Sequence, residues 1–226
     1  ISYLLLTNGS EGQVMPLSQY HKRLDDGDLG PNTGGMGVVG PVFLPLELRQ
    51  KINSEIVQPV LRHLQGSGLL YRGVLYIGLM ITPDGPRVIE FNVRFGDPEC
   101  QVIMPLLEED WGTVFFKLAK GELMPLHWKS LCIACVVLAA PGYPESPERG
   151  VTIEGDIGAQ GASSYFLHAG TAKNSSGEWV TGGGRVLNSI GFGSNLKEAI
   201  KSAYTQAARA SWKRMRMRKD IGAKIN

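Results

Sequence analysis

Short apolar, β-leaning runs and one stretch in which polar and apolar residues alternate predict strands in the first half of the chain. Residues 1–6 read ISYLLL and precede the turn signal Asn8-Gly9, so a return strand is expected next. Residues 73–82 and 87–95 flank the turn signal Pro83-Asp84-Gly85 and should pair as a hairpin. We therefore predict strands over 1–6, 13–17, 73–82 and 87–95.

Apolar residues at helical spacing predict two helices in this half of the chain. Residues 46–64 carry the longer series, and Pro59 inside it should kink or shorten the helix. Residues 111–120 carry the shorter series, which Gly121 closes.

The second half of the chain changes to short strand-like stretches, expected near 133–139, 165–172, 179–182 and 185–191. A helix is expected over 195–215, with Ser194 or Asn195 as its N-cap. The whole is an α+β chain with mostly antiparallel sheets, and we expect domains over 1–125 and 126–226.

Residues 21–41, HKRLDDGDLGPNTGGMGVVGP, are too rich in Gly, Asp and Pro for a helix or a long strand, and a loop of this length is often functional. Its glycines permit close approach of a ligand, and Asn32-Thr33-Gly34-Gly35 can present donors to an anion. Asp25, Asp26 and Asp28 supply carboxylates for an ammonium or amine. A tight-turned connecting loop is the alternative.

One face of the strand at 87–95 carries polar side chains, because alternation puts Val88, Glu90, Asn92 and Arg94 on the same side. A carboxylate and an amide oxygen two residues apart suit Mg²⁺, which takes one or two such ligands together with phosphate oxygens. Arg94 adds a planar fork for phosphate or carboxylate. An ordinary solvated face is the alternative, but the acidic turn Gly96-Asp97-Pro98-Glu99 beside it favours a site.

Composition changes this picture little. The 226 residues are 43% hydrophobic and 19% charged, with a net charge of +2, which is typical of a globular protein and provides no large field for nucleic acid or a membrane. The basic run 213–219, KRMRMRK, is expected to be a solvated helix face. No run of about 18 apolar residues suggests a membrane span.

The three cysteines are expected to be reduced. Cys132 and Cys135 form a C-x-x-C, but they lie in the apolar run LCIACVVLAA, so buried, inert thiols are favoured over a zinc site. Together with Cys100 they indicate a reducing, cytoplasmic location.

Two of these segments carry a resemblance to a known family. HKRLDDGDLGPNTGGMG resembles the HKR-x-x-DGD-x-GPNTGGMG signature of glycinamide ribonucleotide synthetases (phosphoribosylamine–glycine ligases), and EFNVRFGDPECQ resembles their second block. YFLHAGTA, GGRVL and RKDIG resemble their closing domain. After GGMG the family usually has Ala-Tyr-Ser-Pro, where this chain has VVGP.

The resemblance implies the C-terminal part of an ATP-grasp enzyme: the ATP-grasp C-terminal subdomain followed by a small β-rich domain with a terminal helix. Ile1 opens directly into a strand-like stretch, which suggests a cut chain. The chain begins near the middle of the family pattern, so the resemblance implies that the N-terminal domain and the subdomain that covers the triphosphate are missing. The chain alone is therefore expected to be inactive.

The resemblance also implies the chemistry. ATP would phosphorylate the glycine carboxylate, and the amine of 5-phosphoribosylamine would attack the acyl phosphate, giving glycinamide ribonucleotide in purine biosynthesis. Glu90 and Asn92 would hold Mg²⁺ (or Mn²⁺), while Arg94 and Asp97 are the candidate catalytic residues. The candidate substrate-binding residues are Lys22, Arg23, Asp26, Asp28, Asn32, Thr33, Gly34 and Gly35.

Two alternatives stay open at the level of sequence. Another ATP-grasp ligase, such as a carboxylase-type relative, would share the fold but not the two specific blocks. A non-catalytic remnant would keep the fold and act as a binding module.

Overall fold

The computed structural model of the chain describes residues 1–158 and 160–224 and divides into two compact units. The first unit consists of Ile1–Ser18 and Pro41–Lys129, and the second of Gln19–Gly40 with the chain from Ser130 onward. The expected domains, 1–125 and 126–226, stay a prediction, but as a compact unit residues 19–40 go with the C-terminal part.

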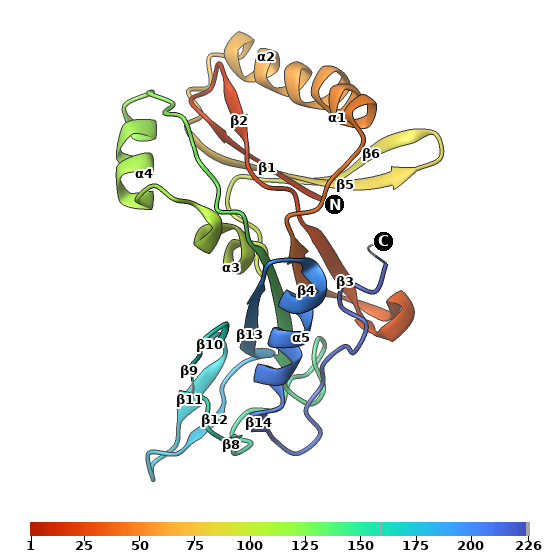
Figure 1. Cartoon of the computed structure of the whole chain (residues 1–226), viewed down its shortest axis with the longest axis vertical. Helices are drawn as coiled ribbons and strands as arrows, with labels where there is room; N and C mark the ends of the chain where they lie inside the picture. Colours follow the sequence, from red (N-terminus) through yellow and green to blue (C-terminus); the bar gives the residue numbers. More distant parts are fainter. Residues whose placement is uncertain (159, 225–226) are drawn as a thin grey trace. The chain divides into compact units, whose positions relative to one another are not determined.

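The first unit is built on a four-stranded antiparallel sheet (Figure 1). Its order is β2 (Gly12–Val14), β1 (Ser2–Thr7), β5 (Gly73–Thr82) and β6 (Gly85–Asn92). The Asn8 side chain makes the turn after β1, since its Oδ1 accepts from the amides of Ser10 and Glu11 at 3.0 and 2.9 Å. The four predicted strands are confirmed, but the second covers only Gly12–Val14 and the fourth ends at Asn92 instead of residue 95, so Arg94 lies beyond the strand on whose face it was expected.

A helical segment runs from α1 (Leu46–Ile52) through a π-turn, η2 (Asn53–Val57), into α2 (Gln58–Gly66). The Gln58 amide bonds to the Asn53 carbonyl, a spacing of five residues, immediately before Pro59. Pro59 therefore does not shorten the helix, because the bonding pattern widens where proline lacks a donor.

The core of the first unit joins one face of its sheet to the helices that follow β6. These are α3 (Cys100–Ile103), the 3₁₀ turn η3 (Met104–Leu106) and α4 (Trp111–Ala119). Leu4, Leu6, Val74 and Tyr76 from the sheet pack with Ile103, Leu107, Val114 and Leu118. Asp110 caps α4 by accepting from the Thr113 amide at 2.7 Å, and the helix ends before Gly121 as expected.

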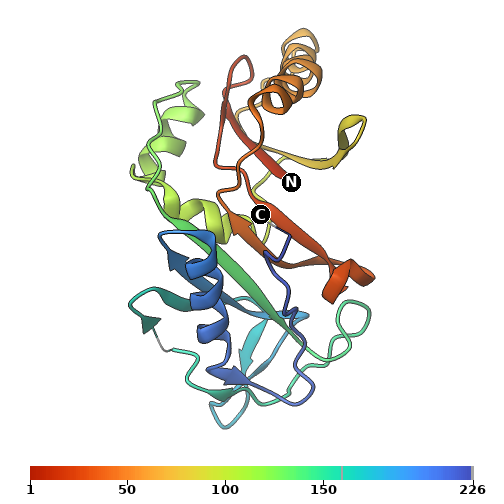
Figure 2. The ribbon, with the colours of Figure 1, turned by 45° about the vertical axis from the view of Figure 1, so that its right-hand side comes forward.

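The second unit is built on a six-stranded antiparallel sheet with one helix, α5 (Leu196–Ala207), against it (Figures 1 and 2). The sheet order is β3 (Gln19–Asp25), β4 (Leu29–Gly40), β7 (Cys132–Ala139), β13 (Arg185–Gly193), β10 (Ser164–His168) and β9 (Gln160–Gly161). Two small ribbons pair β11 (Thr171–Lys173) with β12 (Trp179–Thr181) and β8 (Glu154–Gly155) with β14 (Ala210–Ser211). Asn195 caps α5, accepting from the Glu198 amide at 3.0 Å.

The expected irregular loop at 21–41 is wrong. The segment forms β3, a 3₁₀ turn η1 (Asp26–Asp28) and the 12-residue strand β4. The end of β4 pairs with β7, Gly37–Gly40 opposite Ile133–Val136, so a distant partner strand overrides the weak strand propensity of glycine.

The expected helix over 195–215 ends at Ala207, and the basic run 213–219 is not a helix face. Arg216 instead bridges to the end of β7, exchanging two backbone hydrogen bonds with Ala139 at 2.7 and 3.0 Å. Met215 and Met217 are partly buried against the core, and the Arg218 side chain is completely buried.

The three thiols are free, and Cys135 is buried in β7 as the apolar run indicates. Burial raises the pKa of the Cys132 thiol, and burial together with Asp97 and Glu99 raises the pKa of Cys100, so neither thiol is activated. Within the part of the chain that the structure describes, no helix has the length and apolar character that a membrane span requires.

Candidate functional site

Glu90 and Asn92 lie on one face of β6 in the first unit. The register sets Glu90 opposite Gly78 and Asn92 opposite Tyr76 on β5, two positions that share a face. A Cβ on Gly78 would lie 3.2 Å from Glu90 Cγ, so the Glu90 side chain crosses directly over this glycine. The two predicted metal ligands therefore point the same way.

Val88 is not on that face, contrary to the simple alternation. The register shifts between Gly78 and Leu79, so Val88 pairs with Leu79 while Glu90 pairs with Gly78. The shift leaves an extra residue in β6 between Val88 and Glu90, and it leaves the Glu90–Asn92 pair intact.

A buried carboxylate, Glu99, shares this face. It is 2% exposed, and its Oε1 accepts from Ser2 Oγ at 2.6 Å and from the Tyr76 hydroxyl at 3.0 Å. In the sheet, Gly78 of β5 lies between Ser2 of β1 and Glu90 of β6. Sequence reasoning saw Glu99 only as part of an acidic turn, because its burial depends on β1 and β5.

Arg94 and Asp97 lie in the exposed segment after β6. Arg94 Nη1 donates to the Phe95 carbonyl at 2.8 Å, and Asp97 Oδ1 accepts from Gln101 Nε2 at 3.1 Å. Both residues therefore follow the Glu90–Asn92 pair closely in sequence but lie beyond the strand that carries it.

The side-chain oxygens of Glu90 and Asn92 suit a hard divalent cation. Among residues 1–158 and 160–224, no group of three or more His, Cys, Asp and Glu side chains is arranged to hold a metal. A magnesium ion bound with nucleotide does not require one, since substrate phosphates and water complete a shell begun by one or two protein oxygens. One carboxylate and one amide oxygen on a strand face meet that requirement.

The eight candidate substrate-binding residues all lie on the β3–β4 hairpin of the second unit. Arg23 pairs with Asn32 in register, and Arg23 Nη1 donates to the Gly30 carbonyl at 2.7 Å. The Thr33 hydroxyl donates to the Lys22 carbonyl at 2.8 Å and accepts from the Gly35 amide at 2.9 Å. The Thr33 side chain thus fixes the backbone of the glycine pair.

Gly34 is held from both sides by residues that sequence reasoning did not single out. Its amide donates to the Tyr143 hydroxyl at 2.8 Å, and its carbonyl accepts from Arg185 Nη1 at 2.7 Å. A Cβ at Gly34 would lie 3.1 Å from both Tyr143 Oη and Arg185 Cζ. A side chain at this position would therefore have to displace the ends of the Tyr143 and Arg185 side chains.

The Asp26–Asp28 turn is engaged by the C-terminal segment. Asp28 accepts from Lys224 Nζ at 2.5 Å and from Arg218 Nη1 at 2.7 Å, and these two bonds hold the pKa of the Asp28 carboxyl below its usual value. Asp26 Oδ1 accepts from the Lys219 amide at 2.8 Å. The role predicted for these carboxylates, binding an ammonium or amine, stays a prediction.

The buried side chains of Arg218 and His21 lie close to this turn. The Arg218 guanidinium forks onto Asp220, with Nε–Oδ1 and Nη2–Oδ2 distances of 2.7 Å each, and these bonds hold the pKa of Asp220 well below its usual range. Burial, reinforced by Arg218, lowers the pKa of His21 to about 4, so its ring is neutral. Its Nε2 accepts from the Gly222 amide at 3.2 Å.

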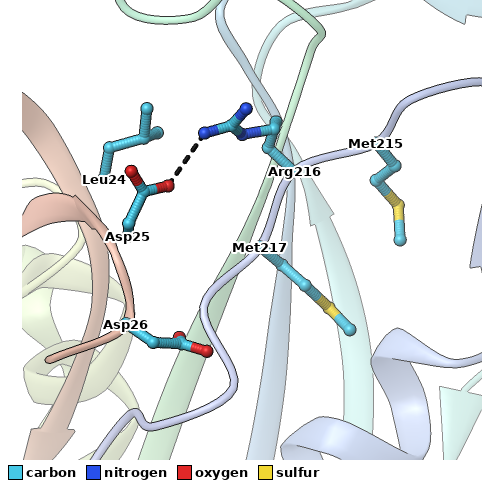
Figure 3. Close-up of a pocket in the computed structure, with 6 residues that line it drawn as sticks. All are labelled: Leu24, Asp25, Asp26, Met215, Arg216 and Met217. Carbon is cyan, nitrogen blue, oxygen red and sulfur yellow. Dashed lines mark hydrogen bonds and ion pairs between the residues drawn. The ribbon is translucent and has the colours of Figure 1, made fainter. Parts of the chain in front are cut away.

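An open cavity of about 350 Å³ lies beside the same turn. Leu24, Asp25 and Asp26 line one side, and Met215, Arg216 and Met217 line the other (Figure 3). Arg216 Nη2 bonds to Asp25 Oδ1 at 2.8 Å, which ties the basic run to β3. Of the predicted substrate residues, the cavity includes only Asp26.

Comparison with known proteins identifies both halves of the chain. The family model of the phosphoribosylglycinamide synthetase ATP-grasp (A) domain matches residues 1–100, and that of the C domain of the same enzyme matches residues 133–224. A phosphoribosylamine–glycine ligase from Nostoc sp. is 42% identical over 231 residues, covering 100% of this chain and 54% of the relative. The chain spans about half the length of the relatives it matches.

Solved structures agree with these matches. The crystal structure of phosphoribosylamine–glycine ligase from Thermotoga maritima has a TM-score of 0.86 at 37% identity, covering 98% of this chain and 55% of that one. A biotin carboxylase domain from Hydrogenobacter thermophilus has a TM-score of 0.67 at 14% identity, covering 96% of this chain and 46% of that one, and shares the fold alone. The α+β, ATP-grasp fold is thus confirmed, and the chain belongs to the phosphoribosylglycinamide synthetase family.

Proposed function

We propose that this chain carries part of the active site of an ATP-dependent ligase that joins glycine to 5-phosphoribosylamine, giving glycinamide ribonucleotide in purine biosynthesis. The observation that carries the proposal is the Glu90–Asn92 pair on one face of β6, within the region matched to the ATP-grasp domain. The family membership supplies the substrates, and the reduced cysteines fit a cytoplasmic location.

On the ATP side, Glu90 and Asn92 would hold Mg²⁺ or Mn²⁺. The bound metal would neutralise phosphate charge. Arg94 would bind the transferring phosphate or the glycine carboxylate, and Asp97 would orient Arg94 or contact substrate. Glu99, which accepts two buried hydrogen bonds on this face, would fix the position of the turn after β6.

On the amine side, the β3–β4 hairpin would bind glycine or 5-phosphoribosylamine. Lys22, Arg23 and Asn32 offer donors, while Thr33, Gly34 and Gly35 hold the backbone in place. The proposed reaction has two steps. The glycine carboxylate takes the γ-phosphoryl group of ATP and releases ADP, and then the amine attacks the acyl carbon, forms the amide, loses a proton and releases phosphate.

The test is a chimera in which this chain replaces the matching region of the Nostoc ligase. The chimera should form glycinamide ribonucleotide with ATP, glycine and phosphoribosylamine all required. Glu90→Gln should lower kcat/KM for Mg–ATP by roughly a hundredfold, as expected when a charged ligand for phosphate-bound metal is lost. A folded chimera that forms no product would refute the ligase and favour a binding module.

The matched control is Glu55→Gln, which makes the same change on the exposed side of η2. Its kcat/KM should stay within about twofold of the parent chimera. An equal loss in both variants would show that the effect of Glu90→Gln is not local to the β6 face.

A further inference from the structure

The C-terminal segment Arg218–Asp220 contacts every residue of the Asp26–Asp28 turn, and we call these three residues the 218–220 clamp. Three hydrogen bonds make the contact: Lys219 amide to Asp26 Oδ1 at 2.8 Å, Gly27 amide to Asp220 Oδ2 at 2.8 Å, and Arg218 Nη1 to Asp28 Oδ1 at 2.7 Å. Each turn residue therefore has its own partner in the clamp.

Arg218 is the centre of the clamp. Its side chain is completely buried, and it binds both oxygens of Asp220, one of Asp28 and, at 3.2 Å, the carbonyl of Arg23. A planar guanidinium can make these bonds at once, whereas a lysine ammonium on a single point cannot. Removing one partner of such a group leaves buried charge uncompensated.

The clamp is itself fixed to the core of the second unit. The Tyr204 hydroxyl, on α5, donates to the Arg218 carbonyl at 3.0 Å and accepts from the Ile221 amide at 3.1 Å. Burial raises the pKa of Tyr204 to about 12, so this hydroxyl keeps its proton. Ile221 is 2% exposed, within the cluster that joins α5 to β4 and β7. The clamp thus fixes the Asp26–Asp28 turn to the core of the second unit.

We propose that Arg218 is a positioning residue for the amine-side substrates. Through Asp28 and Asp220 it fixes the turn from which β4 starts, and so the Asn32–Gly35 strand that presents donors to glycine or to the phosphorylated amine. The Asp28 carboxylate then serves the protein's own cations, Arg218 and Lys224, rather than a substrate ammonium. This inference rests on the proposed function, because it takes the β3–β4 hairpin as the substrate surface.

The first experiment needs no activity. Amide hydrogen exchange is measured on this chain and on Arg218→Lys, which keeps the charge and loses the fork. Exchange of the peptides that cover 26–35 should rise by roughly tenfold, as expected for local opening of a turn that has lost its buried partner. Arg214→Lys is the matched control, because Arg214 is exposed and bonds to Glu148 instead, and it should leave this exchange unchanged.

The second experiment uses the ligase chimera described above. In Arg218→Lys the KM for glycine or for phosphoribosylamine should rise by roughly tenfold, while the KM for Mg–ATP stays within about twofold. At a temperature well below unfolding, a residue that only stabilised the fold would not raise the KM for an amine-side substrate while leaving the KM for Mg–ATP unchanged. Asp28→Asn should reproduce the same split, and it serves in place of Arg218→Lys if the latter does not fold.

If amide exchange over 26–35 is unchanged in both Arg218→Lys and Asp28→Asn, the clamp does not hold the turn, and the positioning role is overturned. Raised exchange with unchanged KM values, or with the KM for Mg–ATP raised equally, would overturn the role in the reaction. A parent chimera without activity would refute the proposed function and the substrate role together, while raised exchange in Arg218→Lys would still establish the clamp.

Discussion

At the scale of single residues, Gly34 of the candidate site is closely packed against two side chains. The Tyr143 hydroxyl and the Arg185 guanidinium each lie 3.1 Å from where a Cβ would be placed. Both neighbours are ends of flexible side chains, so an added methyl group would displace them rather than break the strand. Gly34 is thus a sensitive reporter of how firmly these side chains hold β4.

Gly34→Ala should lower the free energy of unfolding by about 1–2 kcal/mol, the usual range for overpacking. In the background of Tyr143→Phe, which removes the crowding hydroxyl, the same substitution should lower it by less, with a coupling of about 0.5–1 kcal/mol. Urea unfolding of the four proteins measures the cycle. Strictly additive effects would show that Tyr143 does not crowd Gly34 in solution.

His21 makes stability depend on pH. Its pKa of about 4 in the folded chain lies below the ordinary value of 6.5, because the ring is 3% exposed and close to Arg218. Between these values the unfolded chain binds more protons, so the free energy of unfolding falls as pH is lowered from 6.5 to about 4, by roughly 3 kcal/mol.

Urea unfolding at a series of pH values tests this. His21→Gln should remove most of the fall between pH 6.5 and 4, while His63→Gln, at an exposed helix position, should keep it. A fall of equal size in His21→Gln would assign the effect to other groups. The carboxyls of Asp28 and Asp220 also have lowered pKa values, but their contribution is lost only at lower pH.

At the scale of elements, α5 approaches β13 closely enough to require glycine on the strand. A Cβ at Gly191 would lie 2.1 Å from the Ala203 amide nitrogen and 2.4 Å from the Ala199 carbonyl oxygen. Gly191→Ala should therefore displace the helix and lower the free energy of unfolding by about 3 kcal/mol. Gly66→Ala, at the end of α2 with nothing within 4 Å, should change it by less than about 0.5 kcal/mol.

Thermal and urea unfolding of the two alanine variants provide the comparison. Similar small effects would mean that α5 can move away from β13 without loss of packing, and the clamp that Tyr204 anchors would then be less firmly placed than the distances indicate.

Local patterns predicted the elements whose signals are local. The hairpin of β5 and β6 follows from two strand-like runs on either side of Pro83-Asp84-Gly85, and α4 follows from helical spacing. The strand β4 could not be predicted this way, because its pairing partner β7 begins about ninety residues later and its glycines are weak strand formers. The prediction of a helix face for the basic run 213–219 was wrong for the same reason, because Arg216 pairs with Ala139, which is distant in the sequence.

The candidate site divides along the same line. Glu90 and Asn92 share a face because of a two-residue period that sequence shows directly. Tyr143, Arg185 and Arg218 were missed because each reaches its target across more than a hundred residues of chain. Arg185 and Arg218 lie in the family-like segments GGRVL and RKDIG, but the resemblance does not indicate what these two side chains bind.

At the scale of the whole molecule, the candidate ligands divide between the two compact units. Glu90, Asn92, Arg94 and Asp97 belong to the first, and all eight candidate substrate residues belong to the second. A ligase reaction needs both sets, because phosphoryl transfer and amine attack act on the same glycine carboxyl. Under the proposed function the chain would contribute residues to both steps, although it spans about half the length of its relatives.

The purified chain should nevertheless release no phosphate from ATP in the presence of glycine and phosphoribosylamine. The chain spans about half the length of the ligases it matches, and in the proposed ligase the other half would complete the enclosure of the triphosphate. Without that enclosure water would reach the acyl phosphate, and the phosphates would be held from one side only. The Nostoc chimera, assayed in parallel for phosphate release, is the positive control. Glycine-dependent release by the chain alone, abolished by Glu90→Gln, would show that the β6 face and the β3–β4 hairpin suffice for the first step.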